Sequence, residues 1–118
     1  MLNLTQGATV YLACGSTDLR KSIDGLAAIV SQVFELDLFS SSLFVFCNRD
    51  RDKLKILVWD NNGFCLYYRR LERGRFRWPQ QPGQKTLPIS RRQLQWLLDG
   101  LTLEQSLAHA PVTARIAV

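Results

Sequence analysis

At 118 residues, with 47% hydrophobic and 21% charged residues, the chain has the size and composition of one folded domain and not those of a disordered chain. No apolar run of about 18 residues occurs, which excludes a membrane-spanning helix, and Met1–Thr5 lacks the features of a signal peptide. The formal net charge of +5 favours an acidic partner such as nucleic acid. We therefore expect a cytoplasmic protein with no membrane partner.

The N-terminal part predicts a strand followed by a helix. Thr9–Cys14 is rich in β-prone residues, and Gly15 ends this run before the helix-capping residues Ser16–Asp18. Apolar residues then recur at three- and four-residue steps, which predicts a helix over about 18–35 with one apolar stripe. The stripe consists of Leu19, Ile23, Leu26, Val30, Val33 and Phe34.

The middle of the chain predicts antiparallel strands. Leu43–Cys47 is a continuous apolar run typical of a central strand. Lys53–Trp59 alternates, so that Lys53 and Lys55 share one face of a second strand. Asp60–Gly63 carries Asn-Gly, a strong hairpin signal, and leads into a third strand over about 64–71.

The C-terminal part predicts an edge strand, a loop and a helix. Arg75–Trp78 alternates arginines with rings, which fits an edge strand or ribbon, and Gln80–Pro88 predicts a loop. Ser90 is a good N-cap for a helix that Gly100 ends. Residues 101–118 have a weak pattern, with at most a short helix near Glu104–His109, and we expect partial disorder there.

Together these elements predict an α+β fold. We expect an antiparallel β-meander of about four to five strands, packed with an N-terminal and a C-terminal helix. Residues 1–100 would form one domain, followed by the divergent tail 101–118.

Arginines gather between the last predicted strands. Five of the fifteen basic residues fall within nine positions, interleaved with aromatic rings. Guanidinium groups suit phosphate and rings stack on bases, so this segment predicts nucleic-acid contact. Strand alternation would place Arg69 and Arg70 on opposite faces, so the arginines cannot all share one surface. The candidate nucleic-acid-binding residues are Arg69, Arg70, Arg73, Arg75, Arg77, Lys53, Lys55, Arg20 and Lys21.

A plainer interpretation of the same segment stays open: an edge strand kept soluble by charge, with arginine stems covering apolar surface. For the candidates outside the arginine cluster, a solvated face with local ion pairs is the more economical interpretation.

The residues do not predict an enzyme. Asp50 and Asp52 alternate with basic residues, and Asp60 lies in a turn where aspartate is common. The single histidine, His109, has no cysteine nearby with which to share zinc. We therefore expect no catalytic residue, no metal and no cofactor. The three cysteines, Cys14, Cys47 and Cys65, favour reduced core thiols over disulfides.

Two segments together resemble one family. They are Asp18–Leu26, and the run from Leu43 to Pro79 that includes Trp59-Asp60, Tyr67-Tyr68 and Leu71-Glu72-Arg73-Gly74-Arg75-Phe76-Arg77-Trp78-Pro79. They resemble the TnpB family, the second-reading-frame (Orf2-like) accessory proteins of insertion sequences of the 66 family. The resemblance covers about 10–100, and the chain departs from it after Gly100. It implies a protein that assists transposition beside a separate, larger transposase, and it assigns no catalytic residues.

Two functional hypotheses follow. In the first, arginines between Arg69 and Arg77 contact the phosphates of DNA at the element ends. In the second, the protein is an adaptor whose predicted edge near Arg75–Trp78 pairs with the transposase or with another copy of itself. The oligomeric state stays open at this point, and binding to the transposase without DNA would discriminate between the two hypotheses.

Overall fold

The computed structural model describes residues 9–105, which form five strands and two helices, the first continued by a π-helical turn. In chain order these elements are β1 (Val10–Ala13), α1 (Ile23–Ala28), the π-helical turn η1 (Ile29–Val33), β2 (Leu43–Cys47), β3 (Lys53–Asp60), β4 (Gly63–Arg70), β5 (Thr86–Ile89) and α2 (Arg91–Leu98). Most of the predicted tail, including His109, lies outside the described residues. Within them, no helix is long and apolar enough to cross a membrane.

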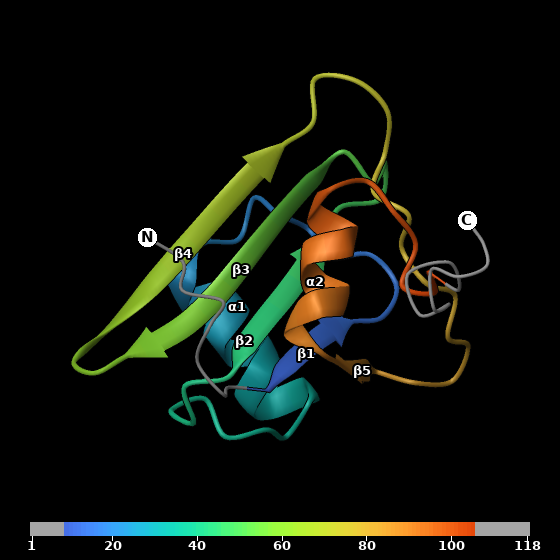
Figure 1. Ribbon diagram of the computed structural model, residues 1–118. Helices are drawn as coiled ribbons and strands as arrows, with labels where there is room; N and C mark the ends of the chain where they lie inside the picture. The colour runs from blue at the N-terminus through green and yellow to red at the C-terminus, as the bar shows by residue number, and fades with distance from the viewer. Residues whose placement is uncertain (1–8, 106–118) are drawn as a thin grey trace.

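The five strands form one mixed sheet in the order β4-β3-β2-β1-β5. The α+β class is confirmed, and β2, β3 and β4 form the predicted antiparallel meander. The sheet is not antiparallel throughout, however, because β1 pairs with β2 in parallel. A parallel pair needs a crossover between its strands, and α1 with η1 supplies it. β5 returns to pair with β1 on the far side, antiparallel (Figure 1).

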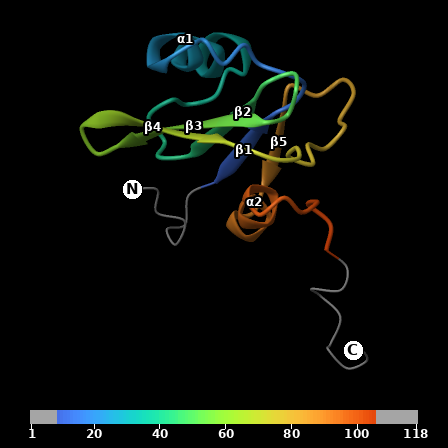
Figure 2. The ribbon, with the colours of Figure 1, turned by 90° about the horizontal axis from the view of Figure 1, so that it is seen from above.

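The sheet has one helix on each face, as Figure 2 shows. The face toward α1 buries a cluster made of Ala13, Leu26, Val30, Phe44, Phe46 and Leu57. The face toward α2 buries a larger cluster, to which β1, β2, β3 and α2 contribute and which also includes Phe76 and Trp78 from the segment after β4. Strand β2, buried at all five positions, separates the two clusters.

The first helix begins later than predicted. Its N-cap is Ser22, and residues 19 and 20 form a turn because the carboxylate of Asp18 accepts hydrogen bonds from both the backbone and the side chain of Arg20. The helix then widens into η1, where the amide of Phe34 donates to the carbonyl of Ile29, five residues back. In this position the ring of Phe34 stacks on Phe46, with 6.2 Å between centroids.

The predicted edge strand at Arg75–Trp78 is wrong. The loop predicted over Gln80–Pro88 is also wrong at its last three residues, 86–88, which belong to strand β5. Residues 75–80 have no strand hydrogen bonding, because Phe76 and Trp78 turn into the α2-side core instead of lying along an edge. The edge strand beside β1 is instead β5, which contains Pro88. Proline is acceptable at an edge because the missing amide faces away from the sheet.

The second helix and the hairpin form where predicted. Ser90 and Gln93 make a reciprocal capping box at the start of α2, and Gly100 has the positive φ of a helix-ending glycine, 84°. The hairpin turn is Asn61–Asn62, in which Asn61 takes the left-handed φ of 63°. These elements depend on local sequence, which explains why they were predictable.

Candidate nucleic-acid interface

The segment that follows β4 presents arginines outward from buried rings. We call residues 73–77 the arginine segment. Phe76 and Trp78 are only 2% and 8% exposed, while Arg73, Arg75 and Arg77 are exposed. Gly74 takes a φ of 74°, in the region that favours glycine, and so allows the chain to turn after Arg73. Alternation between buried rings and exposed arginines therefore holds the guanidinium groups at the surface.

Three contacts fix this segment to the rest of the fold. The backbone amide of Phe76 donates to the carbonyl oxygen of Arg51, 2.7 Å away. The indole Nε1 of Trp78 donates to the carbonyl oxygen of Ala13 at 3.0 Å. The guanidinium of Arg51 lies 5.7 Å from the centre of the Trp78 ring and also donates to the carbonyl of Gly15 at 3.0 Å. The segment lacks regular secondary structure, yet it is anchored at Phe76 and, directly after its last residue, at Trp78.

An open groove of about 1030 Å³ runs beside the arginine segment. Its charged lining residues are three arginines, Arg51, Arg75 and Arg77, against one carboxylate, Glu104. Three amide side chains, from Gln80, Gln81 and Gln93, also line it. Guanidinium groups donate to phosphate and amides both donate and accept, so the groove has the chemistry to hold a polyanion.

The arginine segment is not neutralised by carboxylates. Among the described residues, the ion pairs are Arg20 with Asp18, Lys53 with Asp52 and Arg70 with Glu72. None of them involves Arg73, Arg75 or Arg77. The pKa of Asp52 is lowered, first by a hydrogen bond from Asn48 and only weakly by the charge of Arg75. Arg77 uses its Nε to donate to the carbonyl of Gly100 at 3.2 Å.

The two arginines at the end of β4 point to opposite faces, as alternation predicted. Register places Arg69 opposite Leu54 on the α2 side, and Arg70 opposite Lys53 on the α1 side. Arg69 is half-buried, and its Nη1 donates to the carbonyl of Leu98 at 3.1 Å, at the C-terminal end of α2. A cation there also interacts favourably with the helix dipole, so Arg69 has a structural role.

The remaining candidates gather on the α1 side, away from the arginine segment. Arg20, Lys53 and Lys55 line a second groove of about 990 Å³, together with Arg49 and the exposed ring of Tyr68. The charges of these candidates are largely engaged, because Arg20 and Lys53 belong to the ion pairs above. Lys55 Nζ donates to the carbonyls of Leu19 and Lys21, at 2.8 and 2.9 Å. Lys21 is exposed and is not among the residues that line this groove.

Sequence reasoning missed Arg51 and the three glutamines of the groove. Arg51 stands among alternating acids and bases, a pattern that indicates a charged turn and nothing more. Only the packing of Trp78 against it reveals that it belongs beside the arginine segment. The prediction of core thiols was right for Cys47, which is buried, but wrong for Cys65, which is exposed; Cys14 is half-buried.

The carboxylates weighed as catalytic candidates do not come together. Asp60 ends β3, whereas Asp52 comes immediately before that strand's first residue, so the whole length of β3 separates them. Asp52 accepts a hydrogen bond from Asn48 and forms the ion pair with Lys53. No group of three or more potential metal ligands occurs within residues 9–105.

The fold and this groove define a small basic α+β domain with an arginine-lined groove beside its sheet. A family model described as "IS66 Orf2 like protein" matches residues 8–108. The chain belongs to this family of insertion-sequence accessory proteins. The match extends past Gly100, where the resemblance seen in the sequence ended.

Two curated proteins of Sinorhizobium fredii (strain NBRC 101917 / NGR234) are similar to the chain. Uncharacterized protein y4hO is 41% identical over 101 residues, which is 86% of this chain and 87% of the relative. Uncharacterized protein y4jC is 30% identical over 79 residues, which is 67% of this chain and 68% of the relative. No solved structure matches.

Proposed function

We propose that this insertion-sequence accessory protein binds DNA directly, through the arginine segment and the groove beside it, while a separate transposase of the same element performs the chemistry. The observation that carries the proposal is the set of three exposed arginines without a carboxylate partner among the described residues, fixed outward by the buried rings of Phe76 and Trp78. Always charged and planar, guanidinium groups are well suited to phosphate.

The arrangement favours contact with phosphates over stacking on bases. Phe76 and Trp78, the rings that alternate with the arginines, are buried and cannot receive a base. The expected binding is therefore electrostatic, steeply dependent on salt and only weakly dependent on sequence. In this proposal, the protein adds affinity at the element ends, and the transposase supplies most of the site choice. Both would act in the cytoplasm.

The test measures fluorescence anisotropy of labelled duplexes that carry either an element end or a scrambled sequence. We compare the double variant Arg73→Gln, Arg75→Gln with the double variant Arg20→Gln, Arg70→Gln. Both variants lose two positive charges, but the arginines of the second are paired with carboxylates on the opposite face of the sheet. We expect the first variant to bind DNA much more weakly and the second to bind almost as the wild type does. Equal losses would show that overall charge, and not this segment, is responsible.

A protein-interaction adaptor is the alternative function. It was predicted on an edge strand at Arg75–Trp78, and that strand is absent, because the two rings there are buried. Pull-down of the transposase after nuclease treatment tests the adaptor directly. Capture of the transposase together with absent DNA binding at low salt would favour it over direct DNA contact.

The proposal also assigns no catalysis to this chain. Support comes from the separation of Asp52 and Asp60 by the length of β3, since two-metal nucleases need carboxylates that converge on one site. Metal-dependent cleavage of labelled DNA by the purified protein would overturn this part of the proposal.

A further inference from the structure

The edge of the sheet formed by β4 has hydrogen-bonding groups that no described strand uses. β4 lies at one end of the strand order, paired only with β3. It is eight residues long, and the β3–β4 hairpin extends past the end of β2 (Figure 1). Such an edge is a template for pairing with another chain.

The register identifies which residues of β4 direct their backbone outward. The amide of Leu71 donates to the carbonyl of Asp52 in the strand segment next to it. In an antiparallel pair, every second residue forms its backbone hydrogen bonds with the neighbouring strand. The odd-numbered residues of β4 therefore bond to β3. The backbone N–H and C=O groups of Phe64, Leu66, Tyr68 and Arg70 therefore point away from the sheet.

The opposite edge of the sheet is blocked. The amide of Cys14 donates to the carbonyl of Lys85, and the same alternation makes Thr86 and Pro88 the outward-facing residues of β5. Pro88 has no amide hydrogen to offer another strand, and β5 is only four residues long. β4 has no such protection, because Gly63–Tyr68 contains neither a proline nor a charged residue.

We infer that β4 pairs antiparallel with β4 of a second copy of this chain, joining the two sheets into one continuous sheet across a two-fold axis. This inference goes beyond the proposed function and does not depend on DNA binding. A two-fold axis perpendicular to the sheet keeps both α1 helices on one side and both α2 helices on the other.

Charge selects the direction in which two copies of β4 can pair. Both charged residues of β4, Arg69 and Arg70, stand at its C-terminal end. Parallel pairing of two copies would place arginine beside arginine, whereas antiparallel pairing separates them to opposite ends. Repulsion between the arginines therefore opposes parallel pairing of two copies and leaves the antiparallel direction free of it.

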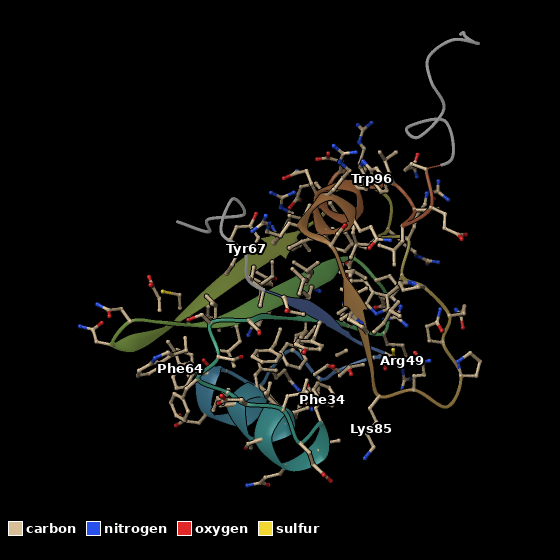
Figure 3. The ribbon with its side chains drawn as sticks, turned by 60° about the horizontal axis from the view of Figure 1, so that its bottom comes forward. Phe34, Arg49, Phe64, Tyr67, Lys85 and Trp96 are labelled. Atoms are coloured by element: carbon tan, nitrogen blue, oxygen red, sulfur yellow. The ribbon has the colours of Figure 1, made fainter. Side chains whose placement is uncertain are left out.

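The side chains are compatible with that pairing. Residues that face each other across an antiparallel pair share a face, so the registers centred on Leu66 or Tyr67 are allowed. Centring on Tyr67 places Arg70 opposite the partner's Phe64, a cation beside a ring on the α1 side. It also places Tyr67 opposite the partner's Tyr67 on the α2 side. Figure 3 shows Phe64 and Tyr67 on these two opposite sides of the sheet.

Such a dimer would also position the proposed DNA contacts. Each β4 leads directly into its own arginine segment. Because the paired strands run in opposite directions, the two arginine segments would leave the joined sheet at its two opposite ends. One dimer would then offer two separate anion-binding surfaces.

The first experiment measures the mass of the full chain in solution by light scattering. Edge pairing buries less surface than a stable complex, so we expect monomer and dimer to exchange between about 5 and 200 µM, with the mass rising toward twice that of the monomer. A mass that stays monomeric over this range would overturn the inference.

Matched proline variants then locate the interface. Tyr68→Pro removes an outward-facing amide of β4 and copies what Pro88 does on β5, without removing a bond to β3. Thr86→Pro places the same residue at an outward-facing position of the blocked edge. We expect Tyr68→Pro to be monomeric at every concentration and Thr86→Pro to behave as the wild type. A dimer that survives in a folded Tyr68→Pro protein, as judged by circular dichroism, would refute pairing through β4.

A second readout uses the wild-type fold and decides the question even if Tyr68→Pro does not fold. Cys65 is exposed on β4, whereas Cys47 is buried and Cys14 half-buried. In either allowed register the two Cys65 residues lie within about 15 Å of each other, two or four residues apart along the strands. A bismaleimide with a spacer of about that length should give a covalent dimer that Cys65→Ser abolishes and Cys14→Ser retains. Absence of that product at concentrations where the mass is dimeric would overturn the inference.

Discussion

The indole Nε1 of Trp78 donates a hydrogen bond to the carbonyl oxygen of Ala13, 65 positions earlier in the sequence and 3.0 Å away. Ala13 ends β1, in the part of the sheet where parallel and antiparallel pairing meet. Through this bond, a segment without regular structure becomes fixed to the sheet. The position of Arg75 and Arg77 depends on it, because both flank the buried rings.

Trp78→Phe should therefore destabilise the fold although an aromatic ring remains at this position. The substitution leaves the carbonyl of Ala13 without this donor in a buried setting, which costs about 1–3 kcal/mol in the free energy of unfolding. Trp59→Phe is the control, since Trp59 packs on Phe39 and Phe64 near the hairpin tip. It should cost at most about 1 kcal/mol, the scale of an aromatic pair. Urea denaturation of both variants measures the difference, and equal stabilities of Trp78→Phe and wild type would contradict this account.

DNA binding should lose part of its salt dependence when the arginine segment is altered. Each phosphate contact contributes about 0.9 to the slope of log K against log salt concentration. Arg73→Gln, Arg75→Gln should therefore make the slope shallower by about 1.8, if both side chains contact phosphate. Anisotropy titrations at four or more salt concentrations give the slope. An unchanged slope in this variant would remove these arginines from the interface.

Arg69 and Arg70 are neighbours in sequence with different structural roles. Arg69→Met should remove the bond to the carbonyl of Leu98 at the end of α2, at a cost of about 1 kcal/mol in the free energy of unfolding. Arg70→Met loses only an exposed pair with Glu72, which contributes about 0–1 kcal/mol. Denaturation of both variants under the same conditions tests this order. A larger loss for Arg70→Met would show that the end of α2 does not depend on Arg69.

The pKa of Asp18 should be unusually low for an exposed carboxylate. Hydrogen bonds from the side chain and the backbone of Arg20 lower it from 3.8 to about 2. Because the folded-state pKa is lowered, the contribution of this pair to stability is present above the unfolded value and is lost as the pH falls through about 2. The contribution itself is small, because solvent screens the pair.

An NMR titration of the Asp18 carboxyl carbon measures this pKa directly. In Arg20→Gln it should return toward the ordinary value of 3.8. Arg49→Gln is the control, since Arg49 is not among the groups that shift Asp18. A pKa near 3.8 in the wild-type protein would mean that the hydrogen bonds between Asp18 and Arg20 do not persist in solution.

Local sequence determined the elements whose stabilising interactions lie within a few residues. Leu43–Cys47 is a strand over the predicted residues, the Asn-Gly signal marks the β3–β4 hairpin, and the capping box of Ser90 with Gln93 starts α2. The separation of Arg69 from Arg70 was also predictable, because side chains alternate along any strand. The family resemblance rested on such local segments too.

Only the tertiary structure decided how distant segments pair and where the charges gather. Whether β1 would lie parallel to β2, and whether β5 would take the edge beside β1, depends on burial of both sheet faces and not on either strand's own residues. Arg75–Trp78 has the alternation of a strand, yet the rings of Phe76 and Trp78 are buried in the core, and Arg51 lies over the Trp78 ring. Packing of those rings left Arg73, Arg75 and Arg77 exposed together, whereas Arg20, Lys53 and Arg70 pair with carboxylates one or two positions away in the sequence. Nearness in the sequence alone does not separate these two groups, because Glu72 is adjacent to Arg73 and yet pairs with Arg70 in the folded protein.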